Sequence, residues 1–207
     1  QSLYSVSHSG FGQENLSYYG IPFFLLLAFV KSLVQSPTIL ISIFHGFNLS
    51  IGFVSCYLVV REFLKREERT TKQNQLIIEA SSILAGLYYT LSPNPIGWWG
   101  YQLLPMNLVF LNPLLFFLLL RFFLTGSMKY LLALLLVTFL FSPNFSFIGA
   151  PTFFSFFPLA VLFLLIYTKV IKKKPIPVVK IAVVILLFVL LKAFHLIPQI
   201  VSILTPG

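Results

Sequence analysis

The sequence predicts an all-α, polytopic transmembrane helical bundle of about six spans, with an additional interfacial helix on its outer side. Three observations predict this class. The 207-residue chain is 58% hydrophobic and only 9% charged, with a mean hydropathy of +0.94, a balance typical of integral membrane proteins. Its apolar residues form runs of nearly the length that crosses about 30 Å of hydrocarbon. Its basic residues gather in alternate connections between these runs.

The expected elements follow one another along the chain. Residues 1–36 contain an outer loop and a short apolar run, Ile21 to Val34, which carries Lys31 and suits the membrane interface better than a crossing. The transmembrane domain occupies 37–207. Its predicted spans lie near 38–60, 76–92, 103–120, 128–142, 152–168 and 178–197.

The distribution of charge predicts the orientation. Twelve of the 14 Lys and Arg residues lie in three connections, at 61–74, 121–129 and 168–180. Because basic loops remain on the cytoplasmic side, we expect a protein of the plasma (inner) membrane with these connections inside and residues 92–103 and 142–152 outside. The net charge of +9 then reflects topology, and we expect no nucleic-acid partner. A single cysteine, Cys56, excludes an internal disulfide.

Small and polar residues share one face of the first predicted span, at spacings of three or four residues. They are Ser42, His45, Asn48, Gly52 and Ser55. Residues at these spacings lie on the same side of a helix, and small side chains let helices approach closely in a membrane. We therefore expect this face to pack against a neighbouring helix. His45 could alternatively line a polar cavity.

The connection LSPNPIGWWGYQ is uncharged and rich in aromatic and amide groups. Trp98 and Trp99 suit the headgroup zone of the bilayer, where they anchor a membrane protein. Together with Asn94 and Gln102 they also offer ring faces and neutral hydrogen-bonding groups, the surface that a sugar needs. Anchoring and sugar binding therefore remain as two interpretations of this segment.

Lys31, Lys192 and His195 stand at the predicted outer ends of their helices, on the side that otherwise avoids positive charge. They could extend to the interface, hold a lipid phosphate of the outer leaflet, or do both. Glu14 is the one carboxylate expected outside, and it is the candidate general base. The chain contains no Asp, and one carboxylate cannot hold a divalent metal with satisfied geometry. We therefore predict no metal site here, and the sequence identifies no cofactor.

Four stretches together resemble polytopic membrane glycosyltransferases of the GT-C type, including arabinofuranosyltransferase-like and YfhO-like proteins. They are YYGIP at 18–22, the basic Arg-x-Phe-Leu at 61–64, LYYTLSPNP at 87–95 and NPLLFFLLLRFFLTGS at 112–127. The resemblance lies in architecture and loop character over most of the chain. It implies transfer of a sugar from a polyprenyl-phosphate donor on the outer face, for envelope glycan or glycolipid synthesis.

The resemblance also bears on the ends of the chain and on Glu14. The family carries a catalytic acid in its first outer loop, usually Asp, and Glu14 is the residue here that matches. The chain begins at Gln1 without a preceding span, so we expect an internal fragment of a longer protein; any divalent metal would need acids from that longer protein. Two alternatives remain open: a transporter or flippase-like carrier, suggested by proline-bearing helices, and a non-catalytic membrane scaffold. Membrane lipids are the expected partners in every case.

Overall fold

The computed structural model describes residues 4–5, 13–14, 21–65, 72–92, 103–140, 156–171 and 178–204. The elements, in chain order, are β1 (Tyr4–Ser5), β2 (Gln13–Glu14), α1 (Ile21–Leu33), α2 (Pro37–Lys65), α3 (Lys72–Leu91), α5 (Leu103–Thr125), α6 (Met128–Leu140), α8 (Phe156–Ile166) with its π-helical continuation η3 (Tyr167–Ile171), and α9 (Val178–Leu204). The predicted helical class is confirmed. A helix occupies part or all of each of the predicted apolar segments.

One feature of the described elements differs from the sequence prediction. β1 and β2 form a two-residue antiparallel ladder, with Tyr4 opposite Glu14 and Ser5 opposite Gln13, within a segment predicted to be a loop. α2 continues past the predicted span to Lys65, as expected from the charges at i and i+4 in the basic connection, which pair Glu62 with Arg66 on a helix. Its last turn carries paired charges, which a helix end outside hydrocarbon can accommodate.

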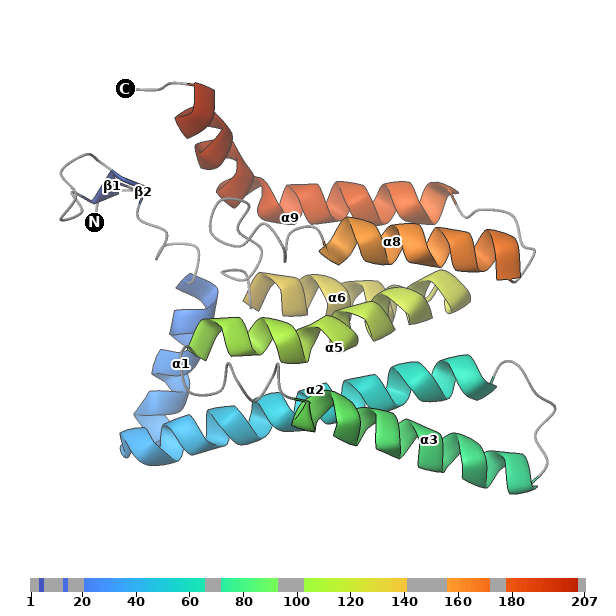
Figure 1. Cartoon of the computed structure of the whole chain (residues 1–207). Coiled ribbons are helices and arrows are strands. Elements are labelled where there is room, and N and C mark those ends of the chain that lie inside the picture. The colour runs from blue at the N-terminus through green and yellow to red at the C-terminus, as the bar shows by residue number, and fades with distance from the viewer. Residues whose placement is uncertain are drawn as a thin grey trace.

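The helices form a bundle whose long axes run broadly in one direction, with α1 lying steeply across one end (Figure 1). The helix ends that flank the predicted basic connections gather at the opposite end: the end of α2 and start of α3, the end of α5 and start of α6, and the end of η3 and start of α9 (Figure 1). We call this the basic end of the bundle. The last part of α9, which contains Pro198, turns away from the bundle direction (Figure 1).

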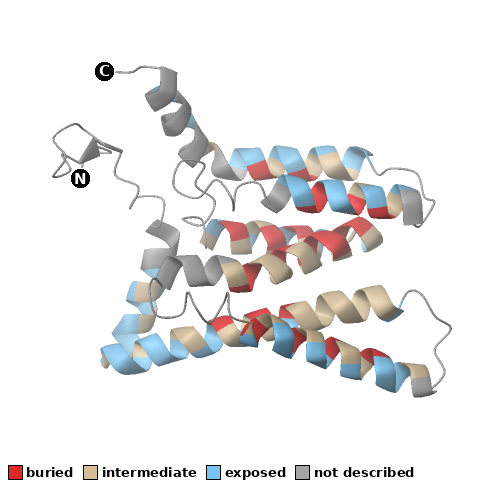
Figure 2. Ribbon diagram, in the orientation of Figure 1, coloured by how far each residue is buried: buried red, intermediate tan, exposed pale blue. Residues whose placement is uncertain are grey.

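α5 is the central helix. Every described side chain from Val109 to Leu124 is buried or half-buried, and Figure 2 shows that buried residues line the surfaces where α5, α6, α8 and α9 face one another. The main cluster joins Leu115 and Leu119 of α5 to Leu131 of α6, Leu164 of α8 and Val184 of α9. Such clustering of large apolar side chains fixes α5 between the other helices.

The small face of α2 packs as the sequence predicted along most of its length. Asn48 and Ser55 are 1% and 2% exposed, and Gly52 is buried between them. A Cβ atom added to Gly52 would lie 2.5 Å from Cδ1 of Phe110 in α5, so a larger residue would require the Phe110 ring to move. Ser42 is an exception, because it is exposed and its hydroxyl donates to the Thr38 carbonyl of its own helix.

A matching small face on α3 was not predicted. Ser82, Gly86 and Thr90 are buried at intervals of four residues, the spacing that places small residues on one helix face. A Cβ atom added to Gly86 would lie 2.8 Å from the Phe53 ring and 2.9 Å from the Phe53 carbonyl oxygen of α2. The antiparallel pair α2–α3 therefore approaches closely through small residues, as membrane helices commonly do.

The outward faces of the helices are apolar. Between Val178 and Leu190 of α9, every exposed residue is apolar, and Figure 2 shows exposed residues along the outer sides of α3, α8 and α9. On α3, Leu76 is 73% exposed and Leu84 is 65% exposed. Buried polar residues include Asn48, Ser55, Ser82, Thr90 and Thr138.

One helix among the described residues, α2, is long and apolar enough to cross a membrane by length and composition. Shorter apolar helical stretches run over Val109–Thr125, Met128–Leu140, Pro158–Lys169 and Val178–Leu190. The chain thus has a helix fit for membrane association, and other helices of the bundle also expose large apolar side chains.

Candidate functional site

Glu14, the candidate base, lies in β2, where its backbone pairs with Tyr4 of β1. Its side chain lies outside the described part of the structure. The candidate sugar-binding residues Asn94, Trp98, Trp99 and Gln102 also lie outside the described residues. Their predicted roles remain predictions.

Lys31 lies in the last turn of α1 and is exposed. Because α1 crosses the bundle at the end opposite the basic end (Figure 1), Lys31 is well separated along the chain and in space from the other described cations.

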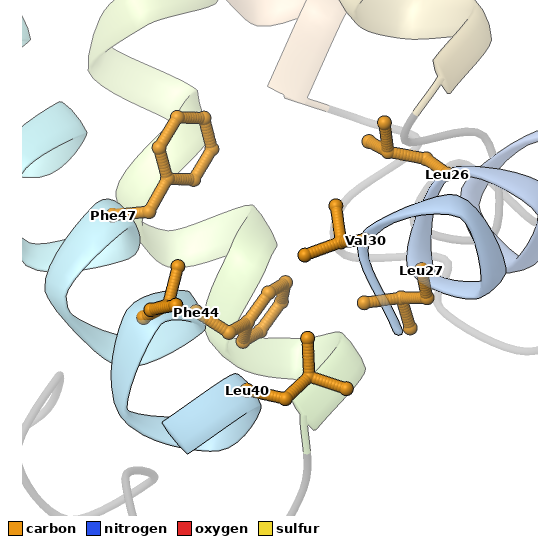
Figure 3. A pocket seen from close by; sticks show the side chains of 7 residues that line it. Leu26, Leu27, Val30, Leu40, Phe44 and Phe47 are labelled. Carbon is orange, nitrogen blue, oxygen red and sulfur yellow. The ribbon is translucent and has the colours of Figure 1, made fainter. Parts of the chain in front are cut away.

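An apolar groove lies beside Lys31, between α1 and the first turns of α2. It encloses about 220 Å³. Figure 3 shows Leu26, Leu27 and Val30 of α1 facing the side chains of α2 across it. Its full lining is Leu26, Leu27, Val30, Leu40, Ile43, Phe44 and Phe47. A groove with no polar side chain in its lining suits a hydrocarbon chain.

Lys192 and His195 are residues of α9 in the part beyond Leu190, which turns away from the bundle direction. Their side chains are outside the described set. Figure 1 shows the last turn of α1 beside the start of α2, and the last part of α9 on the opposite side of the bundle. The structure describes no contact that joins the three predicted phosphate-binding residues.

The basic end holds two ionic clusters. In the first, Glu79 of α3 contacts three side chains of α2. Arg61 Nη2 lies 2.8 Å and Lys65 Nζ 3.8 Å from Glu79 Oε1 as ion pairs, while the Tyr57 hydroxyl donates to Glu79 Oε2. A carboxylate at the edge of a predicted span is expected to pair with a nearby Lys or Arg, and the structure confirms this for Glu79. Because it is paired in this way, Glu79 serves to join α2 to α3.

In the second cluster, Arg121 of α5 joins three helices. Its Nη1 donates to both carboxylate oxygens of Glu62 in α2 at 3.0 Å, and its Nη2 donates to the Tyr130 hydroxyl of α6 at 3.1 Å. Lys129 Nζ lies 5.1 Å from the centre of the same tyrosine ring. The sequence predicted Arg66 as the partner of Glu62; Arg66 lies outside the described residues.

The sequence also did not predict a hydrogen bond between α3 and α5 that a tyrosine hydroxyl donates. Pro113 has no N–H group, so the carbonyl of Val109, four residues earlier in α5, loses its helical donor. The Tyr89 hydroxyl of α3 donates to this carbonyl. Neighbouring helices commonly satisfy backbone groups that proline frees within a membrane. Pro113 in an apolar run, with a tyrosine in the preceding helix, was the available indication.

Within the described ranges, no three His, Cys, Asp or Glu side chains converge on a possible metal site. The described geometry therefore consists of an apolar groove with a nearby cation at one end of the bundle and paired charges at the other. This defines the class as a helical protein with apolar outward faces. Comparison with protein-family models, curated proteins and solved structures finds no match to this chain.

Proposed function

We propose that this chain is a polytopic integral membrane protein in which the helices of the bundle, in addition to α2, lie within the bilayer. The observation that carries this proposal is the apolar outer surface. Water-soluble monomers rarely expose a contiguous apolar patch above a few hundred Å², whereas here several helices present large apolar side chains outward. Hydrocarbon would cover these faces without penalty.

The charges support a definite orientation within this proposal. All the described ion pairs lie at the basic end, together with Lys129, Lys169 and Lys180. Cationic residues next to spans favour the cytoplasmic side. We therefore assign the basic end to the cytoplasm of a cell whose plasma (inner) membrane holds the protein, and the end crossed by α1 to the outside.

For the outer end, we propose a glycosyltransferase activity that uses a polyprenyl-phosphate-linked sugar, for envelope glycan or glycolipid synthesis. The groove between α1 and α2 offers an apolar surface for part of a lipid chain, and Lys31 beside it offers a positive charge for the phosphate. Lys192 and His195, on α9, are the other candidates for contact with lipid phosphate, and the segment with Asn94, Trp98, Trp99 and Gln102 would contact the sugar.

The chemistry requires one base and a good leaving group. The Glu14 carboxylate would take the proton from an acceptor hydroxyl while the hydroxyl oxygen forms a bond to the anomeric carbon. The bond from that carbon to the phosphate oxygen breaks, and the electron pair leaves with the lipid phosphate. Attack from the face opposite the phosphate inverts the anomeric centre. The cations stabilise the charge that develops on the departing phosphate.

The test compares the intact protein with its Glu14→Gln variant, using radiolabelled polyprenyl-phosphate sugars and envelope acceptors. We expect the variant to lose transfer by at least about 100-fold, the usual contribution of a positioned base, while it still binds the donor lipid. Transfer that is equal in both proteins would exclude Glu14 as the base. Absence of transfer by the wild-type protein would exclude the enzyme.

A carrier of lipid-linked substrates is the second candidate, and the interior of the bundle favours it. Discontinuous helices often form the binding sites of carriers, and α5 contains Pro113 at its centre. Asn48 is 1% exposed, and its Nδ2 has no hydrogen-bond partner among the described residues. Movement of labelled lipid between leaflets of proteoliposomes, without sugar transfer, would support this function over the enzyme. If neither sugar transfer nor lipid movement is detected, the membrane scaffold is the remaining function.

A further inference from the structure

A second apolar groove, of about 350 Å³, lies between α8 and α9. Its lining is Pro158, Val161, Leu162, Leu165, Ile181, Ile185, Phe188 and Val189. α8 packs most closely on α5, and α9 packs most closely on α6, so the two helices leave the space between them open. From Pro158 to Leu165 the helical rise gives the groove a length of about 10 Å.

The groove opens toward the outer surface of the bundle. Leu162 is 52% exposed, Ile185 47% and Val189 46%, although each of them contributes to its walls. A hydrocarbon chain of the surrounding bilayer could therefore enter sideways, without displacing a residue of the core. Its position differs from that of the groove beside Lys31, which lies between α1 and α2.

Two cations lie at the basic end of this groove. On α8, the wall of the groove is formed by a stripe that includes Pro158, Leu162 and Leu165. Lys169 of η3 is exposed and lies four residues after Leu165, so it continues this stripe. Lys180 directly precedes Ile181 in the wall formed by α9. Lys180 Nζ has three N–H donors, and one of them donates to the Phe123 carbonyl oxygen at 3.1 Å. The described parts of α8, η3 and α9 contain no acidic residue.

We propose that the groove between α8 and α9 binds an acyl chain of an anionic glycerophospholipid, whose phosphate lies beside Lys169 and Lys180. The inference rests on the membrane location proposed above. An apolar groove alone would accept the chain of any lipid, and the two lysines provide selection for a negative headgroup. Basic residues at the cytoplasmic boundary of membrane helices attract anionic lipids in this way. The bound lipid would fill the space that α8 and α9 leave open.

The test uses the whole chain reconstituted in vesicles containing equal parts of phosphatidylcholine and phosphatidylglycerol. After gentle extraction, native mass spectrometry counts the lipids that remain bound. We expect the wild-type chain to retain phosphatidylglycerol preferentially and Lys169→Gln to lower this preference about fivefold, as loss of one basic contact near a membrane surface does. Lys65→Gln, an exposed lysine at the end of α2 that lies outside the groove, is the matched control and should leave the preference for phosphatidylglycerol unchanged.

A second pair of variants tests the groove itself. Leu162→Trp adds bulk to a half-exposed wall residue and should reduce the retention of both lipids at least several-fold. Leu159→Trp is the control, because Leu159 is 60% exposed on the same helix and does not line the groove. Circular dichroism of each variant checks that its helices are intact.

Three results would overturn the inference. Equal retention of the two lipids by the wild-type chain would exclude selection by the lysines. Equal retention by Leu162→Trp and Leu159→Trp would place the lipid elsewhere. Failure of the wild-type chain to float with the vesicles would reject the membrane location together with the lipid site, whereas flotation without lipid preference would reject the lipid site alone.

Discussion

Replacing Gly86 by alanine adds a methyl group where α2 and α3 are in closest contact. The new Cβ would lie 2.8 Å from Cδ2 of Phe53 and 2.9 Å from its carbonyl oxygen. The ring can rotate away, but the carbonyl belongs to the backbone of α2, so the two helices must separate. At Gly52 the nearest atom, 2.5 Å away, belongs to the Phe110 ring, and relief is easier there. Gly46, on α2, has no atom within 4 Å of its added Cβ.

The surroundings of these three glycines give an order of stability for their alanine variants. All three substitutions gain the helix preference of alanine over glycine, about 1 kcal/mol. Overpacking of a filled interface costs about 1–3 kcal/mol. We therefore expect Gly46→Ala to have a slightly higher free energy of unfolding than the wild-type chain. The free energy of unfolding of Gly52→Ala should be about 1–2 kcal/mol lower than that of Gly46→Ala. The free energy of unfolding of Gly86→Ala should be about 2–3 kcal/mol lower than that of Gly46→Ala, because the close contact there is with a backbone atom.

The assay is equilibrium unfolding of the reconstituted chain, followed by circular dichroism as a denaturing detergent is added. In the Gly52→Ala background, Phe110→Leu should recover part of the loss, since the clashing ring is removed. The same second substitution should not rescue Gly86→Ala, whose contact is with Phe53. Equal stabilities of all three alanine variants would refute the reasoning, because they would show that small residues do not set the approach of α2 to its neighbours.

Two further substitutions test single contacts. Tyr89→Phe keeps the ring but leaves the Val109 carbonyl beside Pro113 without its donor; we expect a loss of about 0.5–2 kcal/mol in the same unfolding assay, and an unchanged stability would show that the bond contributes nothing. Gly126→Ala forces a Cβ into a left-handed residue with φ of 70°, next to Lys180 Nζ at 3.2 Å, and should cost about 1–2 kcal/mol. Gly126→Asn should cost less, since asparagine tolerates this conformation, and equal losses would contradict the argument.

The sequence predicted where the helices lie because each is a long apolar run bounded by proline, glycine or charge. Ser36 and Pro37 illustrate this. Ser36 directly precedes α2, its carbonyl accepts from Leu40 N at 3.1 Å, and proline suits the first helical position. Gly126 likewise ends α5 in a left-handed conformation that glycine adopts without strain.

The neighbours of each helix could not be predicted in the same way. α5, α6, α8 and α9 are all apolar around most of their circumference, so composition does not show that α5 is central. The small face of Ser82, Gly86 and Thr90 is visible in the sequence, but its partner depends on how the helices assemble. Glu79 required a cation, and only the packing of α2 against α3 selects Arg61 as its closest partner.

The candidate site was predicted less completely than the fold. Lys31 lies exposed beside an apolar groove, and no sequence pattern indicated that α1 and α2 would leave that space between them. The roles of Glu14 and of residues 92–103 depend on side chains outside the described part of the chain, so sequence chemistry remains their support.

The most direct test of the membrane account measures on which side each end of the bundle lies. In a Cys56→Ser background, single cysteines replace Gln35, near the end crossed by α1, and Thr125, at the basic end; both positions are exposed. An impermeant maleimide is then added to sealed, right-side-out vesicles. We predict labelling of Gln35→Cys in intact vesicles and of Thr125→Cys only after permeabilisation. Equal labelling of both cysteines in intact vesicles would contradict a bundle that crosses the membrane.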